Sequence, residues 1–257
     1  MRDEPMIARH SPVAHAAYHD LLRLLADEAA SELRGTPVRV ERGGRVYWYD
    51  AYRVGSDVRR RYVGEDTPEL RARFARRAEL RAEAEARRAR RTRLVRLLRA
   101  EGFLGLDAGT GGLLAAMAGA GVFRLGGTVV GTNAFRLYEG ELGLRFAFDE
   151  AAMTEDVDIA SFERLSLALE DAVSPPLTEV LSEFAFEPVP SLRAGKVWRW
   201  RQSRSGALVE FLTPSFRAEE DLRPLPALGV EAQSLHFLNY LIAEPIRAAA
   251  LYRSGVT

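Results

Sequence analysis

Two short apolar runs between residues 126 and 160 carry polar residues where a buried strand does not normally have them. The first run, 128–130, leads into Gly131-Thr132, and the second is Asp156-Val157-Asp158-Ile159. Because side chains alternate along a strand, the valine and isoleucine should point to one face and the two aspartates to the other, about 6 to 7 Å apart. Two carboxylates on one face suit Mg²⁺, which prefers oxygen ligands and shares its shell with substrate phosphates. This pattern predicts metal-dependent chemistry on a nucleoside triphosphate.

A third carboxylate is expected on a neighbouring strand. The best candidate is Glu210, which lies in the centre of the apolar run 207–214, ALVEFLTP. An isolated acid in a strand core is costly unless it is paired or bound to a metal. We therefore predict that Glu210 completes the site.

The turn before the aspartates is the candidate phosphate-binding element. Gly131 allows backbone N–H groups to come close to a phosphate, and the N-terminus of the helix expected from Ala134 to Glu141 attracts anions. Thr132 adds a hydroxyl group. We expect Gly131 and Thr132 to contact the nucleotide.

The order of strand, Gly-Thr, helix, Asp-x-Asp and a later single acid resembles the nucleotidyltransferase fold of the DNA polymerase β superfamily. The segments VGTNAF, TEDVDIA and FLTP, at 130–135, 154–160 and 211–214, are similar to a little-characterised bacterial nucleotidyltransferase-like branch. That branch also has an aromatic hairpin like the one at 47–49, so the resemblance covers most of the chain.

The resemblance implies an α+β (mixed α/β) fold, whose core has a mixed sheet flanked by helices. It implies transfer of an NMP from an NTP with Mg²⁺ or Mn²⁺, with Asp156, Asp158 and Glu210 as catalytic metal ligands. Gly131 and Thr132 would bind the phosphates. Thr132 stands where Ser or Gly is commoner, and Glu210 where Asp is usual. Relatives continue into a basic C-terminal helical segment, so the sequence is expected to be a fragment or a shortened form.

Other interpretations stay open at this point. A catalytically inactive member of the same fold would bind nucleotide or RNA without turning it over. More distantly, residues 107–112, DAGTGG, resemble the Gly-rich loop of S-adenosylmethionine-dependent methyltransferases, but that loop must follow a buried strand, and an Arg-rich segment precedes it here. His15 and His19 are one helical turn apart and lack a third zinc ligand at a matching spacing.

The composition fits an enzyme that works in the cytoplasm. The 257 residues contain no cysteine, which excludes disulfides and thiolate metal sites. No apolar run reaches the roughly 18 residues of a membrane span, and the N-terminus lacks a secretory apolar core. We expect an accessory region at 1–102 and the nucleotidyltransferase-like core at 103–257.

The accessory region should contain a helix at 12–34, antiparallel strands within 38–63 and one long Arg-rich helix from 68 to 101, capped by Thr67-Pro68. This last segment holds twelve arginines against five glutamates. Its arginines either contact the phosphates of an RNA acceptor such as tRNA, or form the charged surface of an ordinary helix.

Beyond residue 102 the sequence predicts Gly-rich loops before the first core strand. A hairpin with arms at 196–201 and 207–213 should carry Glu210. A helix at 231–243 should be the last element of the chain, with His236 packed in the protein core or at an interface. Tyr47, Trp48 and Tyr49 are expected to pack within a strand.

Overall fold

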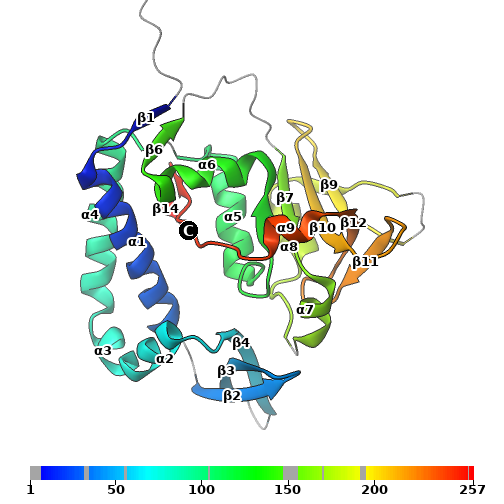
Figure 1. Cartoon of the computed structure of the whole chain (residues 1–257), viewed down its shortest axis with the longest axis horizontal. Helices are drawn as coiled ribbons and strands as arrows, with labels where there is room; N and C mark the ends of the chain where they lie inside the picture. Colours follow the sequence, from blue (N-terminus) through cyan, green and yellow to red (C-terminus); the bar gives the residue numbers. More distant parts are fainter. Residues whose placement is uncertain are drawn as a thin grey trace, which may run out of the picture.

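The computed structural model describes residues 7–31, 35–54, 57–103, 105–146, 156–169, 171–191, 195–253 and 255–257. Figure 1 shows helices α1 to α4 and a small sheet on one side of the molecule, and a larger sheet with its own helices on the other. Within the described residues the protein is α+β with a mixed sheet flanked by helices, which confirms the predicted fold class.

The accessory helices pack around α1, Pro12–Ser31. Helix α4, Ala84–Ala100, lies beside it (Figure 1). Their interface is a small apolar core that also takes up Phe103 and residues near the C-terminus. The side chains buried there come from both helices and include Tyr18, Leu21, Leu94 and Leu98.

The prediction of one long Arg-rich helix is wrong. The segment forms α2 (Pro68–Ala75), α3 (Arg77–Ala82) and α4, with breaks at Arg76 and Glu83. In a continuous helix Phe74 and Leu80 would fall on different faces. The bends let Phe74 contact Trp48 edge to face while Leu80 is fully buried. The predicted cap is confirmed, since Thr67 accepts a hydrogen bond from the N–H of Leu70.

A three-stranded antiparallel sheet follows α1 in the chain. It consists of β2 (Thr36–Arg42), β3 (Arg45–Val54) and β4 (Asp57–Glu65), in that order. Tyr47 and Tyr49 are buried, as predicted. The sheet is joined to the core through Asp171, whose carboxylate accepts a hydrogen bond from the N–H of Tyr62 at 2.7 Å.

The segment predicted to be Gly-rich loops contains helix α5, Ala108–Ala120. Asp107 caps it by accepting a hydrogen bond from the N–H of Thr110 at 2.8 Å. Gly111 is needed for packing, because a Cβ at this position would lie 2.2 Å from the Cβ of Tyr252. Small residues thus allow close helix packing here, and the expectation of loops was wrong.

The core sheet has seven strands in the described chain, with the order β11-β12-β10-β7-β5 and with β8 and β9 extending from β10. Strand β10, Leu208–Ser215, lies at its centre. It pairs in parallel with β7, Val157–Ala160, on one edge. Its other edge is shared by β9 at the start and β12 at the end. The remaining strands are β5 (Thr128–Val130), β8 (Phe186–Pro188), β9 (Arg199–Gln202), β11 (Leu222–Leu225) and β12 (Val230–His236).

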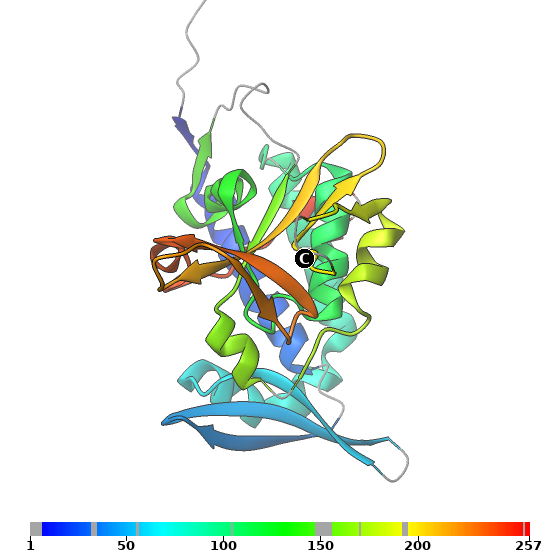
Figure 2. The same ribbon diagram turned by 90° about the vertical axis from the view of Figure 1, so that its right-hand side faces the viewer.

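Helices cover both faces of this sheet (Figure 2). Helices α5 and α8, Leu177–Glu183, bury Val157, Ile159, Val209 and Phe211 on one face. On the other face, the short helix α9, Leu238–Ile242, packs on Val130, Ala160 and Leu212. The prediction of a helix at 231–243 is therefore wrong for the first half of that segment. That half is strand β12, because Val230, Ala232 and Ser234 alternate into the core.

Several elements connect the two parts of the molecule. Helix α6, Gly131–Leu142, and strand β6, Leu144–Phe146, follow β5, and β6 pairs with the N-terminal strand β1, Ile7–Arg9. Helix α7, Glu163–Ala168, follows β7. The hairpin of β13 (Leu251–Tyr252) and β14 (Gly255–Val256) returns to α4, where the Arg99 side chain donates to the Tyr252 carbonyl at 2.6 Å.

None of the described helices combines the length and apolar character that a membrane crossing requires.

Candidate active site

The two aspartates lie at the start of β7, and their side chains alternate with buried apolar ones as predicted. Val157 and Ile159 are almost completely buried against the α5 and α8 face. Asp158 is half-buried on the opposite face. Asp156 precedes the strand, and its Oδ1 accepts a hydrogen bond from the N–H of Leu208 at 2.7 Å. This bond fixes Asp156 at the beginning of β10.

Glu210 is the direct neighbour of Asp158 across the parallel pair β7 and β10. The two residues are register partners, so the single acid of the later strand lies beside the Asp-x-Asp pair. The Arg199 guanidinium, on the antiparallel neighbour β9, approaches Glu210 with 3.9 Å between Nη1 and Oε1. Arg199 could not be predicted as a site residue from the sequence, because only the register of β9 brings it beside Glu210.

The Gly-Thr turn meets the acids from the other side. Strand β5 pairs antiparallel with β7 and sets Val130 opposite Asp158. Gly131 has φ +71°, and a Cβ on it would lie 2.5 Å from Oδ2 of Asp158. Only glycine combines this left-handed backbone with so close an approach. The predicted phosphate-binding turn and the predicted acids are therefore in contact.

Helix α6 begins at this turn, three residues earlier than predicted. Its N-cap, Val130, makes no side-chain capping bond. The buried Asn133 donates from Nδ2 to the carbonyl of Asp156 at 2.6 Å, which ties the first turn of α6 to the start of β7. Asn133 was not predicted as a site residue, although it lies in the quoted VGTNAF segment. A helix N-terminus beside these carboxylates can bind the phosphates of a ligand that also carries a cation.

The pKa values of Asp158 and Glu210 are both raised, which indicates that neighbouring groups of the protein do not fully neutralise the negative charge of these acids. Burial raises the pKa of Asp158, and the neighbouring Asp156 raises it further. Burial also raises the pKa of Glu210, with Asp158 adding to the effect and Arg199 opposing it. Partly buried acids whose pKa values are raised by burial and by a neighbouring carboxylate are typical of functional centres. A bound cation would relieve this repulsion.

The donor set fits a magnesium ion that shares its ligands with a substrate. Within the described part of the chain, no three His, Cys, Asp or Glu side chains come together closely enough to hold a metal alone. Mg²⁺ is commonly bound by one or two carboxylates together with substrate phosphates and water. Asp156 and Asp158 meet that requirement. Glu210 faces Arg199 in this arrangement, and its predicted role as a third ligand stays a prediction.

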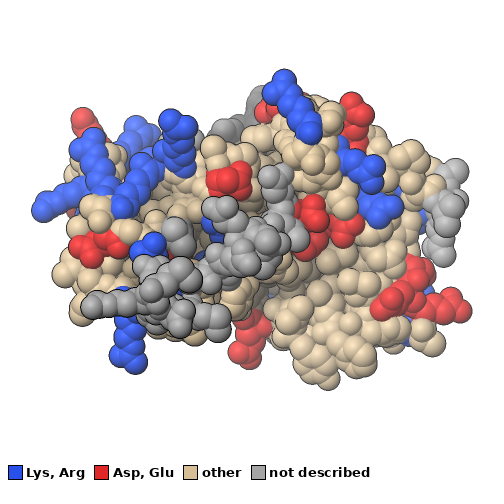
Figure 3. All heavy atoms as spheres, turned by 90° about the horizontal axis from the view of Figure 1, so that it is seen from above, with Lys and Arg blue, Asp and Glu red and all other residues tan. Residues whose placement is uncertain are grey.

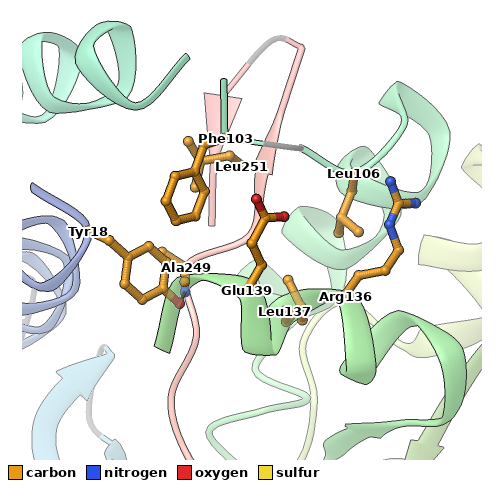
Figure 4. Close-up of a pocket in the computed structure, with 9 residues that line it drawn as sticks. Tyr18, Phe103, Leu106, Arg136, Leu137, Glu139, Ala249 and Leu251 are labelled. Atoms are coloured by element: carbon orange, nitrogen blue, oxygen red, sulfur yellow. Dashed lines mark hydrogen bonds between the residues drawn. The ribbon is translucent and has the colours of Figure 1, made fainter. Parts of the chain in front are cut away.

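A small pocket elsewhere can be distinguished from this site. It lies where α1, α6 and the C-terminal segment meet, and it is lined by Tyr18, Phe103, Glu139 and Leu251, among others (Figure 4). With a cavity of about 10 Å³ it holds at most one water molecule. Glu139 is already bonded to Nε2 of His10 at 2.5 Å. This pocket is too small for a nucleotide.

The histidines do not form a site with the acids. His15 and His19 contact each other at 3.0 Å between their Nε2 atoms, and among the described residues no further His, Cys, Asp or Glu side chain joins them as a metal ligand. His236 lies in a strand rather than a helix, and it is partly exposed instead of forming core.

Comparison with known families identifies the family of the larger part of the chain. The model of a family described as Nucleotidyltransferase matches residues 108–257, which is more than half of the chain. A domain of unknown function matches residues 16–72. Comparisons with curated proteins and with solved structures found no match. The chain belongs to this nucleotidyltransferase family.

Proposed function

We propose that the protein is a metal-dependent nucleotidyltransferase of the DNA polymerase β superfamily, which transfers an NMP from an NTP to a hydroxyl group of an acceptor. One observation carries this proposal: the adjacent strands β5, β7 and β10 bring the turn at Gly131, directly after β5, next to Asp158 on β7 and Glu210 on β10. The turn that we propose for phosphate binding is thus next to the acids that we propose for cation binding, which supports the assignment. The family match independently supports a transferase.

In the proposed reaction, the backbone N–H groups after Gly131 and the Thr132 hydroxyl hold the triphosphate. Asp156 and Asp158 would hold Mg²⁺ or Mn²⁺, which would neutralise the phosphate charge and favour an in-line displacement. The acceptor oxygen forms a bond to the α-phosphorus while the bond from that phosphorus to the bridging oxygen breaks, and pyrophosphate leaves.

Glu210 is suited to receive the proton from the acceptor hydroxyl. Its raised pKa brings it closer to neutral pH, where a carboxylate is a better base. Arg199 beside it opposes the rise in the pKa of Glu210, and it would be able to pair with phosphate once Glu210 has taken up the proton. The register of β9, β10 and β7, which sets Glu210 beside both Arg199 and Asp158, supports these proposed roles.

We propose an RNA such as tRNA as the acceptor, because basic side chains gather on the accessory helices. Arg88, Arg90, Arg93, Arg96 and Arg99 are exposed on α4. Figure 3 shows basic side chains concentrated at its left-hand end, the end formed by α1 and α4. Some are already paired with acids of α1, as Arg90 is with Asp20 at 3.2 Å. Phosphate contacts of this kind are electrostatic and should weaken steeply with salt.

The test is incubation of the protein with each α-³²P-labelled NTP, Mg²⁺ or Mn²⁺, and total tRNA. Label should pass to the tRNA with the wild type and be lost with Asp156→Ala and with Asp158→Asn. Glu183→Gln, an exposed acid on α8, is the matched control and should keep full activity. NTP binding without any transfer would favour an inactive nucleotide-binding member of the fold.

A further inference from the structure

Trp198, which directly precedes β9, lies on the same face of the core sheet as the acids. Its partly buried ring packs against an apolar cluster that includes Val130 and Leu212. Val130 is the register partner of Asp158, and Leu212 lies two residues beyond Glu210 along β10. Side chains two residues apart on a strand share a face. The ring of Trp198 therefore adjoins the candidate active site.

The side chain of Arg199 interacts with this ring and with an acid at the same time. The Cζ atom of Arg199 lies over the Trp198 ring, 5.1 Å from the ring centroid. Its Nη1 atom is 3.9 Å from Oε1 of Glu210. A guanidinium group within about 6 Å of an aromatic centroid is attracted by the negative face of the ring, and its planar shape suits stacking.

Two consecutive side chains do not share a face in a regular strand. Arg199 is the register partner of Glu210, and the next residue, Trp200, points to the opposite face, where its ring packs on Phe211. Trp198 departs from this alternation, because it lies just before the first residue of β9. Its carbonyl still accepts a hydrogen bond from the N–H of Phe211 at 2.8 Å. The backbone thus stays tied to β10 while the indole remains beside Arg199.

The ion pair alone would hold Arg199 only loosely. The side chain of Arg199 is 39% exposed and that of Glu210 is 24% exposed. An ion pair that is this open to water contributes little, because two long side chains must lose conformational freedom to form it. The ring of Trp198, anchored in the apolar cluster, supplies a second contact that limits the conformations of the arginine.

We propose that Trp198 is a positioning residue for Arg199, whose guanidinium it holds beside Glu210, where it can pair with phosphate during nucleotidyl transfer. This inference rests on the proposed function, which assigns that pairing to Arg199. Trp198 itself contacts neither the phosphates nor the cation in this scheme. Loss of the ring should therefore act through Arg199, and it should lower the rate of transfer rather than the affinity for the NTP.

The first measurement does not depend on activity. It follows the NMR resonance of the Arg199 Nε–Hε group in the ¹⁵N-labelled full chain, assigned by its absence from Arg199→Met. The ring current should shift this resonance upfield in the wild type and in Trp198→Phe, which keeps an aromatic face. Trp198→Met fills much of the same apolar space without a ring and should abolish the shift. An unchanged resonance in Trp198→Met would overturn the inference.

The second measurement is the kcat and KM of labelled-NTP transfer. Trp198→Met should lower kcat roughly fivefold, as loss of a partly exposed cation–π contact does, and should leave KM within about twofold. Trp198→Phe should stay close to the wild type. Arg199→Met should lower kcat further, and adding Trp198→Met to it should have no additional effect. Arg204→Met, which changes an exposed arginine in the turn after β9, is the matched control and should leave kcat unchanged.

The outcomes separate this inference from the proposed function. An equal loss of kcat from Trp198→Met in the wild-type and Arg199→Met backgrounds, or a raised KM with unchanged kcat, would show a merely structural role and overturn the inference alone. Full activity of Arg199→Met would do the same, and Trp198→Leu replaces Trp198→Met if that variant does not fold. A wild type that transfers no label would overturn the proposed function and the role of Trp198 in it, and the persisting ring-current shift would distinguish this failure from loss of the contact itself.

Discussion

Gly131 lies against the carboxylate of Asp158, so closely that a methyl group on Gly131 would come within 2.5 Å of Oδ2. The contact joins the turn that begins α6 to the acidic strand β7. Any change that moves the turn must also move the acid. The sequence marks these two residues separately, and the antiparallel pairing of β5 with β7 brings them together.

Gly131→Ala should therefore reduce both stability and activity. A left-handed alanine alone costs about 1 to 2 kcal/mol. At Gly131 the new methyl group must also displace the Asp158 carboxylate, so we expect a larger loss there than the left-handed backbone alone would cause. Gly206→Ala is the matched control, since Gly206 has φ +80° and nothing within 4 Å of its would-be Cβ. Urea unfolding of both variants measures the difference, and equal losses would contradict the crowding at Gly131.

Asp158→Asn should raise stability at neutral pH while abolishing nucleotidyl transfer. The pKa of Asp158 is raised by burial and by Asp156, so the native state binds this proton more tightly than the unfolded state does. Stability then falls as the pH rises from the unfolded pKa of about 3.9 through the higher native pKa. Asparagine cannot ionise and so avoids this loss of stability. The variant should therefore be more stable than the wild type at pH 7, and the difference should vanish near pH 4.

Thermal melts of Asp158→Asn and of the wild type across this pH range test whether the variant is the more stable of the two at pH 7. Mg²⁺ should raise the melting temperature of the wild type at pH 7 and have little effect on the variant, because bound cation stabilises only the state that holds it. Glu183→Gln should melt like the wild type throughout. A variant that is less stable than wild type at pH 7 would show that Asp158 is already neutralised by the protein.

The buried pair of His10 and Glu139 should contribute strongly to joining the N-terminal segment to the core. Both side chains are only 3% exposed, and His10 also stacks on Phe103. Removing one partner of a buried pair typically costs about 3 to 5 kcal/mol. We expect His10→Ala and Glu139→Ala each to approach this range, with strong coupling in a double-mutant cycle. The exposed pair Arg23 and Asp20 serves as control and should couple by less than about 1 kcal/mol.

Asp107→Ala should destabilise the protein by about 1 kcal/mol through loss of the α5 cap. Burial alone would raise the pKa of Asp107, but hydrogen bonds from Thr110 and Gly109 lower it below its ordinary value. Its ionised form therefore adds stability above about pH 4, and this contribution is lost as the pH falls through the lower native pKa. Asp107→Asn should keep most of the cap without this pH dependence, as denaturant titrations at pH 3 and pH 7 would show.

The acids and the turn could be predicted because their pattern is local. Two-residue alternation places Asp156 and Asp158 on one face, and one acid in an apolar run marks Glu210 as unusual. The register that makes Glu210 the partner of Asp158 depends on the pairing of strands that are far apart in the sequence, so local patterns do not predict it. The same is true of Arg199, which reaches the site only because β9 pairs with the first half of β10.

The elements that were predicted wrongly show where local patterns fail. Residues 231–236 have enough apolar residues for either a strand or a helix, and the free edge of β10 decides in favour of β12. The glycines of α5 suggest a loop, yet their lack of side chains is what allows Tyr252 to pack against the helix. Tertiary contact overrides local propensity in both cases.

The arrangement of β5, β7 and β10 also has a consequence for how the protein folds. Gly131 directly follows β5 and lies 27 residues before Asp158 of β7, which in turn lies 52 residues before Glu210 of β10. No two of these strands are joined by a tight hairpin. Such non-local pairing is slow, because long loops must close before the contacts form. We therefore expect nucleotide binding to reappear during refolding only as the central sheet closes, well after the local helices have formed.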